Sequence, residues 1–311
     1  MTEVIINHAL RSEDGKPSYT YDGSFKSLPE GVTQRSNAKS EAFKVGIVDA
    51  RDAGLNASLT ENGYCLATGF KSSLDLQNRA LDSDKILQVY YPEIAELVVQ
   101  TLGGTAQVAR AVVFDHTVRS RTRRAKGEKE TNGENVGGYA SRAHNDNTSE
   151  SAKNRVRLLA KTREHGGSHT VREPLLTPSD AETIISGRFG IFNVWRHFRS
   201  DYPVRDYPLA VLDAQSTKPE DFFASQYIYP DRVGEVVSVV RNEAHRWIYY
   251  REMRDSEALV FKVFDSACEM GLMTREQCPP NTAHTSFRLP GSDAQTPARE
   301  SIECRVLVQF A

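Results

Sequence analysis

The feature that most limits what this chain can fold into is a run of strand-like segments from residue 188 to the C-terminus. Apolar residues alternate or occupy both faces in "RFGIFNVWRHF", "YPLAVLDAQS", "GEVVSVVRNEAHRWIYY", "EALVFKVFDS" and "ESIECRVLVQF". Strands that follow one another in this way favour an antiparallel jelly roll or barrel over a parallel sheet. We therefore expect a mainly β fold with flanking helices, a double-stranded β-helix of the cupin-like jelly-roll type.

The first half of the chain mixes helical and strand-like segments. The expected helices, each with a stop at glycine, cover residues 82–104, 149–167 and 177–187. The expected strands cover residues 44–51, 59–70 and 106–119. Residues 119–138 are charged and almost without apolar side chains, which predicts a mobile loop or lid. We expect one jelly-roll domain over 45–311, with residues 1–44 as an N-terminal extension packed on it.

Composition narrows the class of protein. With a net charge of −2, the molecule lacks the overall positive charge that is typical of proteins that bind nucleic acids. The four cysteines form no C-x-x-C pair and are typical of reduced thiols. The N-terminus has no basic stretch followed by an apolar run, and the most apolar windows are too short to span a membrane. These features predict a cytoplasmic protein with neither a membrane nor a nucleic acid as partner.

A candidate metal site comes from three residues in a fixed order. His144 and Asp146 are two positions apart, so on a strand both side chains point to the same side. His284 follows much later, in "AHTSF", near the last strands. Two histidines and one carboxylate on one face of a metal, with the other positions open, are the ligand set of non-haem Fe(II) oxygenases.

The last strand carries a matching basic residue. Arg299 and Ser301 come fifteen and seventeen positions after His284. An arginine suits the far carboxylate of 2-oxoglutarate because its planar fork binds a carboxylate through two hydrogen bonds and stays charged when buried. The ordered set His144, Asp146, His284 and Arg299 is therefore the candidate site.

Two other histidines compete for the second ligand position. His245 lies in "EAHRWIYY", and no Arg-x-Ser follows it at short range, so a core histidine beside Trp247 is the preferred interpretation. His116, in "FDHTVR", is interpreted as a packing residue at the end of a strand. His284 is preferred over both.

With these residues assembled, the chain resembles the fungal and bacterial Fe(II)/2-oxoglutarate-dependent oxygenases that include the cephem 7-methoxylase component and the aspergillic-acid hydroxylase/desaturase. The matching stretches run through residues 45–311 and include "VVFDHTVR", "AHND", "SGRFGIFNVWR", "HRWIYYREMRDSEALVFKVFDS", "AHTSF" and "ARESIECRVLV". The resemblance implies His144, Asp146 and His284 as iron ligands and Arg299 as the 2-oxoglutarate clamp. It departs at Asn145, where the family has an apolar residue, and this side chain is expected to point away from the metal.

The resemblance also implies the chemistry. Fe(II), 2-oxoglutarate and O₂ would support hydroxylation, desaturation or radical ring closure of a small molecule, with the organic chemistry supplied mainly by the cofactors. Asn193 lies on the expected strand "FGIFNVWRHF" and could donate to the iron-side carboxylate of 2-oxoglutarate or be an ordinary polar strand residue. Arg196 on the same strand could contact an acidic ligand or form a salt bridge.

A cluster of arginines precedes the His-x-Asp segment. Arg119, Arg121 and Arg123, with Arg124, form either a solvated loop or a collar that attracts an acidic substrate. Under the second interpretation the substrate carries carboxylates, as an amino-acid-derived natural-product intermediate would. A ring-forming oxygenase of the kainoid-synthase kind would fit that chemistry.

Other functions remain open from the sequence. An Fe(II) oxidase without 2-oxoglutarate would use Arg299 and Ser301 to bind the carboxylate of its own substrate. A non-catalytic, cupin-like protein that binds a small acid is a third interpretation. A zinc hydrolase would leave the Arg-x-Ser strand without a role, and a methyltransferase lacks the G-x-G-x-x-G nucleotide loop.

Overall fold

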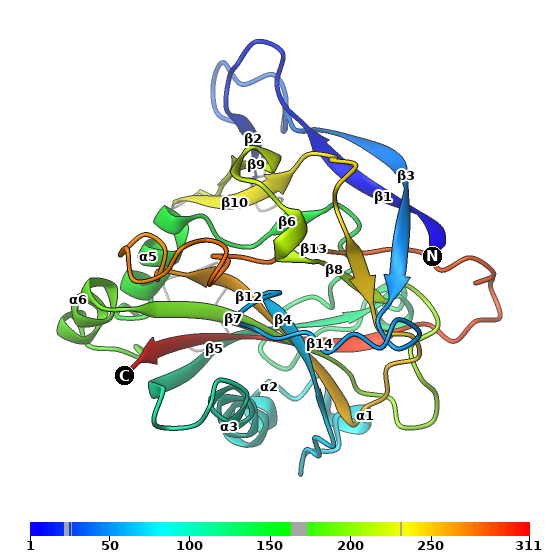
Figure 1. The fold of residues 1–311 in the computed structure, drawn as a ribbon. Helices are drawn as coiled ribbons and strands as arrows, with labels where there is room; N and C mark the ends of the chain where they lie inside the picture. The colour runs from blue at the N-terminus through cyan, green and yellow to red at the C-terminus, as the bar shows by residue number, and fades with distance from the viewer. Residues whose placement is uncertain (22–24, 26, 163–172, 231) are drawn as a thin grey trace.

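The computed structural model describes residues 1–21, 25, 27–162, 173–230 and 232–311. In this part of the chain the strands form two sheets (Figure 1). Apolar side chains from both sheets pack in one buried cluster. The mainly β fold with flanking helices that the sequence predicts is confirmed, and it is the double-stranded β-helix arrangement. No helix among the described residues is long and apolar enough to cross a bilayer.

The larger sheet carries the strands from which the candidate ligands come. Its nine strands lie in the order β1-β3-β11-β8-β13-β6-β10-β9-β2. They are β1 (Thr2–Leu10), β2 (Ser18–Tyr21), β3 (Lys39–Asp49), β6 (His144–Asn145), β8 (Leu209–Leu212), β9 (Phe222–Ile228), β10 (Val233–Val239), β11 (Trp247–Tyr249) and β13 (His284–Ser286). The short β6 and β13 pair with each other, which brings two distant segments of the chain together.

The smaller sheet is antiparallel throughout and lies in the order β4-β12-β7-β14-β5. Its strands are β4 (Tyr64–Thr68), β5 (Val108–Ser120), β7 (Phe189–His197), β12 (Glu257–Asp265) and β14 (Glu300–Phe310). Side chains of β14 alternate between its two faces. Ile302, Cys304 and Val306 pack in the cluster beneath α3, whereas Leu307 packs between the sheets.

Helices cover the outer face of the smaller sheet and one end of the molecule. They are α1 (Leu76–Arg79), α2 (Ser83–Lys85), the π-helical η1 (Ile86–Tyr90), α3 (Tyr91–Thr101), α4 (Arg121–Ala125), α5 (Ser149–Leu158), α6 (Pro178–Ser186) and the 3₁₀ turns η2 (Ala214–Ser216) and η3 (Pro219–Asp221). Thr148 and Thr177 begin α5 and α6 with capping boxes, in which a side-chain oxygen accepts from a free amide of the first turn.

Most of the predicted elements are present, with shifted bounds. The helix expected over 82–104 is α2, η1 and α3 in succession, and the helix expected over 177–187 is α6. The helix expected over 149–167 ends at Leu158, and its expected stop at Gly166 lies outside the described residues.

Two expectations about how the chain is organised stay predictions, and the structure gives the elements in both segments. β1, β2 and β3 belong to the larger sheet, so the boundary expected at residue 44 falls inside β3. The charged stretch 119–138 contains α4 and returns to β5 through a bridge between Arg119 and Gly137. Its mobility stays a prediction.

Candidate metal centre

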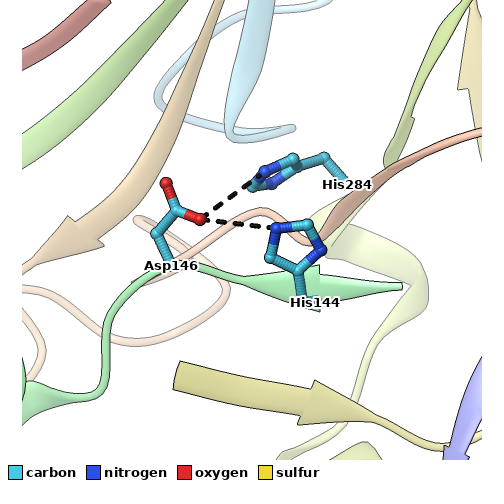
Figure 2. Close-up of side chains that lie close together, drawn as sticks. All are labelled: His144, Asp146 and His284. Carbon is cyan, nitrogen blue, oxygen red and sulfur yellow. Dashed lines mark ion pairs between the residues drawn. The ribbon is translucent and has the colours of Figure 1, made fainter. Parts of the chain in front are cut away.

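Three side chains meet where β6 and β13 pair. His144 lies opposite His284 in the register, and their ring centroids are 4.4 Å apart. Asp146 Oδ1 lies 3.4 Å from His144 Nε2 and 3.8 Å from His284 Nε2 (Figure 2). One ligand atom from each residue lies within 4.8 Å of the other two. The three residues that the sequence singles out are therefore brought together at one point between the sheets.

The geometry of these atoms fits a metal ion. Ligands about 2.1 Å from a metal and at right angles to each other are separated by about 3.0 Å, which is close to the separations seen here. His144 Nδ1 lies 2.7 Å from the carbonyl of Arg142. A ring N–H donated to that carbonyl leaves the lone pair on Nε2, which faces the cluster.

The electrostatics also favour metal binding. Burial, followed by the neighbouring His144, lowers the pKa of His284 to about 3, so its imidazole is neutral and can donate a lone pair. Burial raises the pKa of the Asp146 carboxyl, but Arg305 and the two histidines outweigh it and hold that pKa well below its usual range. The cluster thus offers two imidazole nitrogens and one carboxylate.

Asp146 presents only one of its two oxygens to the histidines. Its Oδ2 accepts hydrogen bonds from Arg305 Nε at 3.1 Å and from Asn193 Nδ2 at 2.9 Å. The donor expected on Asn193 is therefore engaged with the candidate iron ligand and not directed toward a separate carboxylate. Asn145 donates to the carbonyls of Asn147 and Val263, so its amide group contacts backbone outside the cluster.

Arg305 is a functional residue that the sequence reasoning missed. It also donates to Asp115 and to Glu303, at 3.0 and 3.2 Å, so one guanidinium joins three carboxylates. A signal for it was present, because Arg299, Ser301, Glu303 and Arg305 follow one another at period two on the last strand. Such a row predicts a polar inner face on β14.

Arg299 and Ser301 lie at the start of that face. Arg299 is 1% exposed, and its guanidinium carbon lies 4.2 Å from the ring centre of Tyr139. Its Nη1 donates to the carbonyl of Tyr207. Among the described residues neither Arg299 Nε nor Ser301 Oγ has a hydrogen-bond partner, although both atoms are buried. Burial lowers the pKa of Arg299 to about 10, so the side chain is charged at neutral pH.

Buried donors without partners cost free energy unless a ligand satisfies them. Arg299 Nε and Ser301 Oγ therefore indicate that an acceptor with more than one oxygen binds here. A carboxylate supplies such an acceptor and matches the guanidinium fork.

The other predicted arginines are spread over different parts of the structure. Arg119 is paired with Ser301 across β5 and β14 and donates to the carbonyl of Gly138. Arg121 is about half exposed and lies 3.4 Å from Asp206. Arg123 is bound to Glu300 and Glu128, which makes it part of the scaffold.

Arg196 does not lie with the cluster. It faces the helices on the outer side of the smaller sheet, where it donates to the carbonyl of Asp255 and stacks on Phe70. The strand period places Asn193 and Arg196 on opposite faces, and Asn193 is the one that reaches Asp146. A contact between Arg196 and a ligand of the cluster therefore does not fit the structure.

The two rejected histidines lie elsewhere. His245 Nε2 is 3.1 Å from Asp221, and the His245 ring packs on His8. His116 is buried between Tyr91 and Glu130, with ring nitrogens 2.8 and 2.9 Å from their oxygens. Neither is among the three side chains that meet at the candidate centre.

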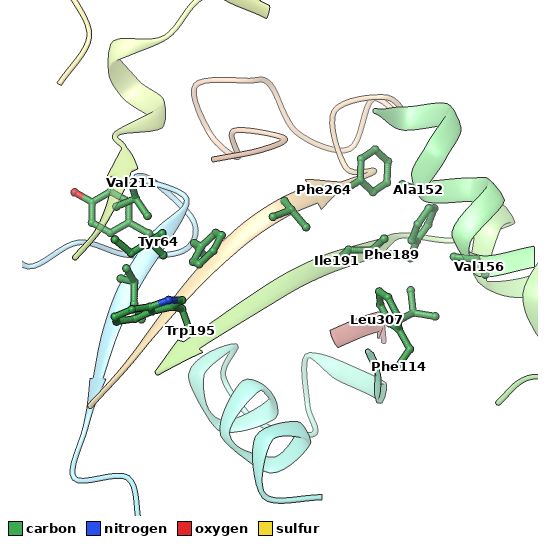
Figure 3. Packing of buried hydrophobic residues seen from close by; sticks show 14 of the residues in the cluster. Tyr64, Phe114, Ala152, Val156, Phe189, Ile191, Trp195, Val211, Phe264 and Leu307 are labelled. Atoms are coloured by element: carbon green, nitrogen blue, oxygen red, sulfur yellow. The ribbon is translucent and has the colours of Figure 1, made fainter. Parts of the chain in front are cut away.

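A cavity of about 300 Å³ reaches Asp146 from outside. It lies between α5 and the hairpin of β9 and β10, and Arg155, Arg232 and Tyr229 are among its lining residues. Apolar side chains pack against the cluster between the sheets. The ring centre of Phe261 lies 4.7 Å from that of His284, and Phe261 belongs to the same buried apolar cluster as Trp195, Phe189 and Leu307 (Figure 3). The cluster thus has an apolar neighbour in Phe261 and a polar opening beside Asp146.

Comparisons with known proteins agree with this arrangement. A family model described as oxidoreductase/YMDC permease-like domain matches residues 6–309. The alpha-ketoglutarate-dependent dioxygenase phiK of a fungal species is 28% identical over 296 residues, which cover 93% of this chain and 92% of that protein. Aspirochlorine biosynthesis protein N of Aspergillus oryzae is 36% identical over 136 residues, or 43% of this chain, and the chain spans about half (53%) of that protein.

The fold has a counterpart of known structure. The iron and alpha-ketoglutarate-dependent endoperoxidase NvfI superposes with a TM-score of 0.76 at 23% identity, over 99% of this chain and 97% of that one. Because the family model matches nearly all of the sequence, the chain belongs to this oxidoreductase family and, by homology over more than nine-tenths of its length, to the Fe(II)- and 2-oxoglutarate-dependent oxygenases that include fungal hydroxylase/desaturases.

Proposed function

We propose that His144, Asp146 and His284 hold the iron, that Arg299 and Ser301 bind 2-oxoglutarate, and that the enzyme oxidises a small carboxylate-bearing, amino-acid-derived natural-product intermediate. The observation that carries the proposal is the convergence of three ligand atoms within 4.8 Å, on the same inner space as two buried donors without partners. A cytoplasmic location belongs to the same proposal.

Bound iron and 2-oxoglutarate would supply the oxidising chemistry, in which O₂ and the oxo acid give succinate, CO₂ and an oxidised substrate. The residues of the chain provide geometry. Asp146 turns Oδ1 toward the metal because Arg305 and Asn193 hold Oδ2. Phe261 and the apolar side chains packed with it would exclude water from the side of His284.

The cavity beside Asp146 supports the substrate class. Arg155 and Arg232 line it and place two guanidinium groups at the entrance to the metal site. Tyr229 beneath Arg232 adds an aromatic surface, with the guanidinium carbon 4.1 Å from the ring centre. The positive charge of these two side chains would attract a compact molecule with a carboxylate to the entrance.

The first experiment tests the iron and 2-oxoglutarate sites together. Purified protein is mixed anaerobically with Fe(II) and 2-oxoglutarate. We expect a metal-to-ligand charge-transfer band at about 500 nm, as for other chelated Fe(II) centres of this ligand set. Asp146→Ala should abolish the band because it removes the only carboxylate ligand. Asp206→Ala is the matched control and should keep it. A band of wild-type strength in Asp146→Ala would overturn the ligand assignment.

A second experiment separates the proposal from its alternatives. Turnover with amino-acid-derived carboxylic acids should release one succinate for each substrate oxidised. Oxidation without succinate would indicate an Fe(II) oxidase in which Arg299 and Ser301 bind the substrate itself. A protein that binds acids but takes up no Fe(II) would be the non-catalytic small-acid-binding alternative.

A further inference from the structure

A group of buried reactive side chains lies away from the metal centre, at the end of β12. Lys262, Asp265 and Cys278 are 2%, 1% and 1% exposed. Lys262 Nζ lies 2.9 Å from Cys278 Sγ. Asp265 Oδ2 lies 3.4 Å from that nitrogen and 3.3 Å from that sulfur. An amine, a thiol and a carboxylate therefore meet at one point.

The local backbone explains how they meet. Residues three apart on a regular strand point to opposite faces. The register of β12 against β7 shifts between Lys262 and Phe264, and this bulge turns Lys262 and Asp265 toward the same place. Cys278 arrives from the segment that leads to β13, so the cluster is assembled from two separate parts of the chain.

The contact between nitrogen and sulfur is close. At 2.9 Å these atoms are as near as the nitrogen and oxygen of an ordinary hydrogen bond, although sulfur is larger than oxygen. Arg188 holds the carboxylate from the other side, with Nε and Nη2 at 3.2 and 3.0 Å from its two oxygens. The amine and the thiol are thus fixed against each other by a carboxylate that is itself fixed.

We propose that Lys262 and Cys278 form a site of oxidative cross-linking, in which dioxygen joins Nζ and Sγ through one bridging oxygen atom. The amine and the thiol lose one N–H and one S–H bond, and the O–O bond breaks. One N–O bond and one S–O bond form, and the second oxygen atom leaves as water with the two hydrogens. Sulfur and nitrogen each give up two electrons, and dioxygen takes up four.

The neighbours suit this reaction. Burial raises the pKa of the Cys278 thiol, so the thiol is the resting form, and Asp265 Oδ2 is placed to accept its proton as sulfur is oxidised. Dioxygen is small and apolar, so it can enter where larger oxidants are excluded.

The cross-link would affect the position of His284 through a backbone hydrogen bond. Lys262 accepts a hydrogen bond at its carbonyl from the amide of Thr282, two residues before His284. A covalent bond between residues 262 and 278 would close the loop between β12 and β13 and restrict the segment that carries this ligand.

The experiment uses the full chain without added iron, so its result does not depend on the proposed function. Protein purified under reductant is divided, and one half is held in air-saturated buffer. The expected result is an intact mass increased by one oxygen and decreased by two hydrogens, which dithiothreitol reverses. Proteolytic fragments should join the peptide of Lys262 to the peptide of Cys278.

Variants distinguish this cross-link from a disulfide. Cys278→Ser and Lys262→Met should abolish the mass change, whereas Cys268→Ser should retain it, although Cys268 Sγ lies 3.1 Å from the carbonyl of Cys278. A loss of two hydrogens without gain of oxygen, absent in Cys268→Ser, would replace the proposal with a disulfide. An unchanged mass in air would also overturn it. If Lys262→Met fails to fold, the wild-type chain still tests the proposal, because its proteolytic fragments either do or do not join the peptide of Lys262 to the peptide of Cys278.

Discussion

Arg305 Nε donates to Asp146 Oδ2 over 3.1 Å, while Asp146 Oδ1 faces both histidines of the candidate centre. One arginine on the last strand therefore sets which oxygen of the carboxylate is presented to the metal. It acts through Asp146, which makes it a positioning residue. Outer partners of metal ligands fix the orientation of the ligand and raise the affinity for the metal.

Replacing Arg305 should weaken iron binding. In Arg305→Met, Asp146 loses its charged donor, and we expect the affinity for Fe(II) to fall by about 10- to 100-fold. Anaerobic titration with Fe(II) measures it. Asn193→Ala removes the neutral donor to the same oxygen and should have the smaller effect. Equal affinities in Arg305→Met and the wild type would show that Asp146 is oriented without Arg305.

Arg305→Met should also reduce stability, which needs a separate measurement. Asp115 and Glu303 would lose their partner while buried, and breaking a buried ion pair costs about 3–5 kcal/mol. Urea unfolding of the iron-free protein gives this cost. The titration with Fe(II) is then made under conditions in which the variant is folded.

Arg299 should control the affinity for 2-oxoglutarate. A charged hydrogen bond contributes about 1.5–3 kcal/mol, so Arg299→Gln should raise the KM for 2-oxoglutarate by about 10- to 100-fold. Arg299→Lys keeps the charge but loses the guanidinium fork, so its KM for 2-oxoglutarate should lie between those of the wild type and Arg299→Gln. Arg123→Gln is the matched control, since Arg123 is bound to Glu300 and Glu128. A KM unchanged in Arg299→Gln would remove Arg299 from the site.

The ligands could be predicted from the sequence because their order along the chain follows from the fold. A His-x-Asp pair places both side chains on one side of a short strand, and a jelly roll brings a late strand beside it. The structure pairs His144 with His284 in this way. The row of Arg299 and Ser301 on the last strand could be predicted for the same reason.

The sequence places Arg305 in the polar row of the last strand, but it does not show that this side chain contacts Asp146, which is 159 positions away. The place of the first 44 residues in the larger sheet could not be predicted from the sequence either. Only the second half of β3 falls in the strand expected over residues 44–51, because the first half, residues 39–43, is almost entirely exposed and mostly polar. Strands pair through backbone groups, so the side chains of a segment give little indication of which strand it will pair with.

The arginine collar can be tested by comparing two neighbours. Arg121 is about half exposed and lines a cavity of about 690 Å³ with Arg124 and Arg288. We expect Arg121→Ala to raise the substrate KM a few-fold at low salt and to have no effect at high salt, because exposed charges are screened.

Arg123→Ala is the matched comparison for the collar. Arg123 is held by Glu300, so we expect this variant to lose stability and to keep the salt dependence of the wild type. The double variant Arg121→Ala plus Arg123→Ala gives the decisive measurement. An unchanged substrate KM at low salt in that variant would leave the loop as a solvated segment without a role in attraction.

The buried pair of His116 and Glu130 should anchor the charged stretch 119–138. His116 Nε2 lies 2.9 Å from Glu130 Oε2, and both side chains are almost fully buried. His116→Phe removes this buried hydrogen bond and leaves Glu130 Oε2 with Ser83 Oγ, and we expect the free energy of unfolding to fall by about 1–3 kcal/mol. Glu128→Ala, which removes a half-exposed partner of Arg123 in the same stretch, should cost less than about 1 kcal/mol. Similar losses in both variants would contradict the anchor.

His8 should make the protein sensitive to mild acid. Burial, together with His245 and Arg241, lowers the pKa of His8 to about 4, although the carbonyl of Ile6 favours the protonated ring. In the unfolded chain its pKa is about 6.5. Between these values the unfolded state binds a proton that the folded state does not, so stability falls as the pH falls from about 6.5 toward 4.

Urea unfolding at several pH values checks this expectation. Each buried histidine of this kind adds a slope of at most about 1.4 kcal/mol per pH unit. His8→Leu should reduce the slope because the side chain no longer titrates. His245→Leu, at the ring stacked on His8, should reduce it less, since Asp221 at 3.1 Å favours the protonated form of His245. If wild type and His8→Leu lose stability along the same curve, proton binding by His8 is not the source of acid sensitivity, and the buried carboxylates around Arg305 become the group to test.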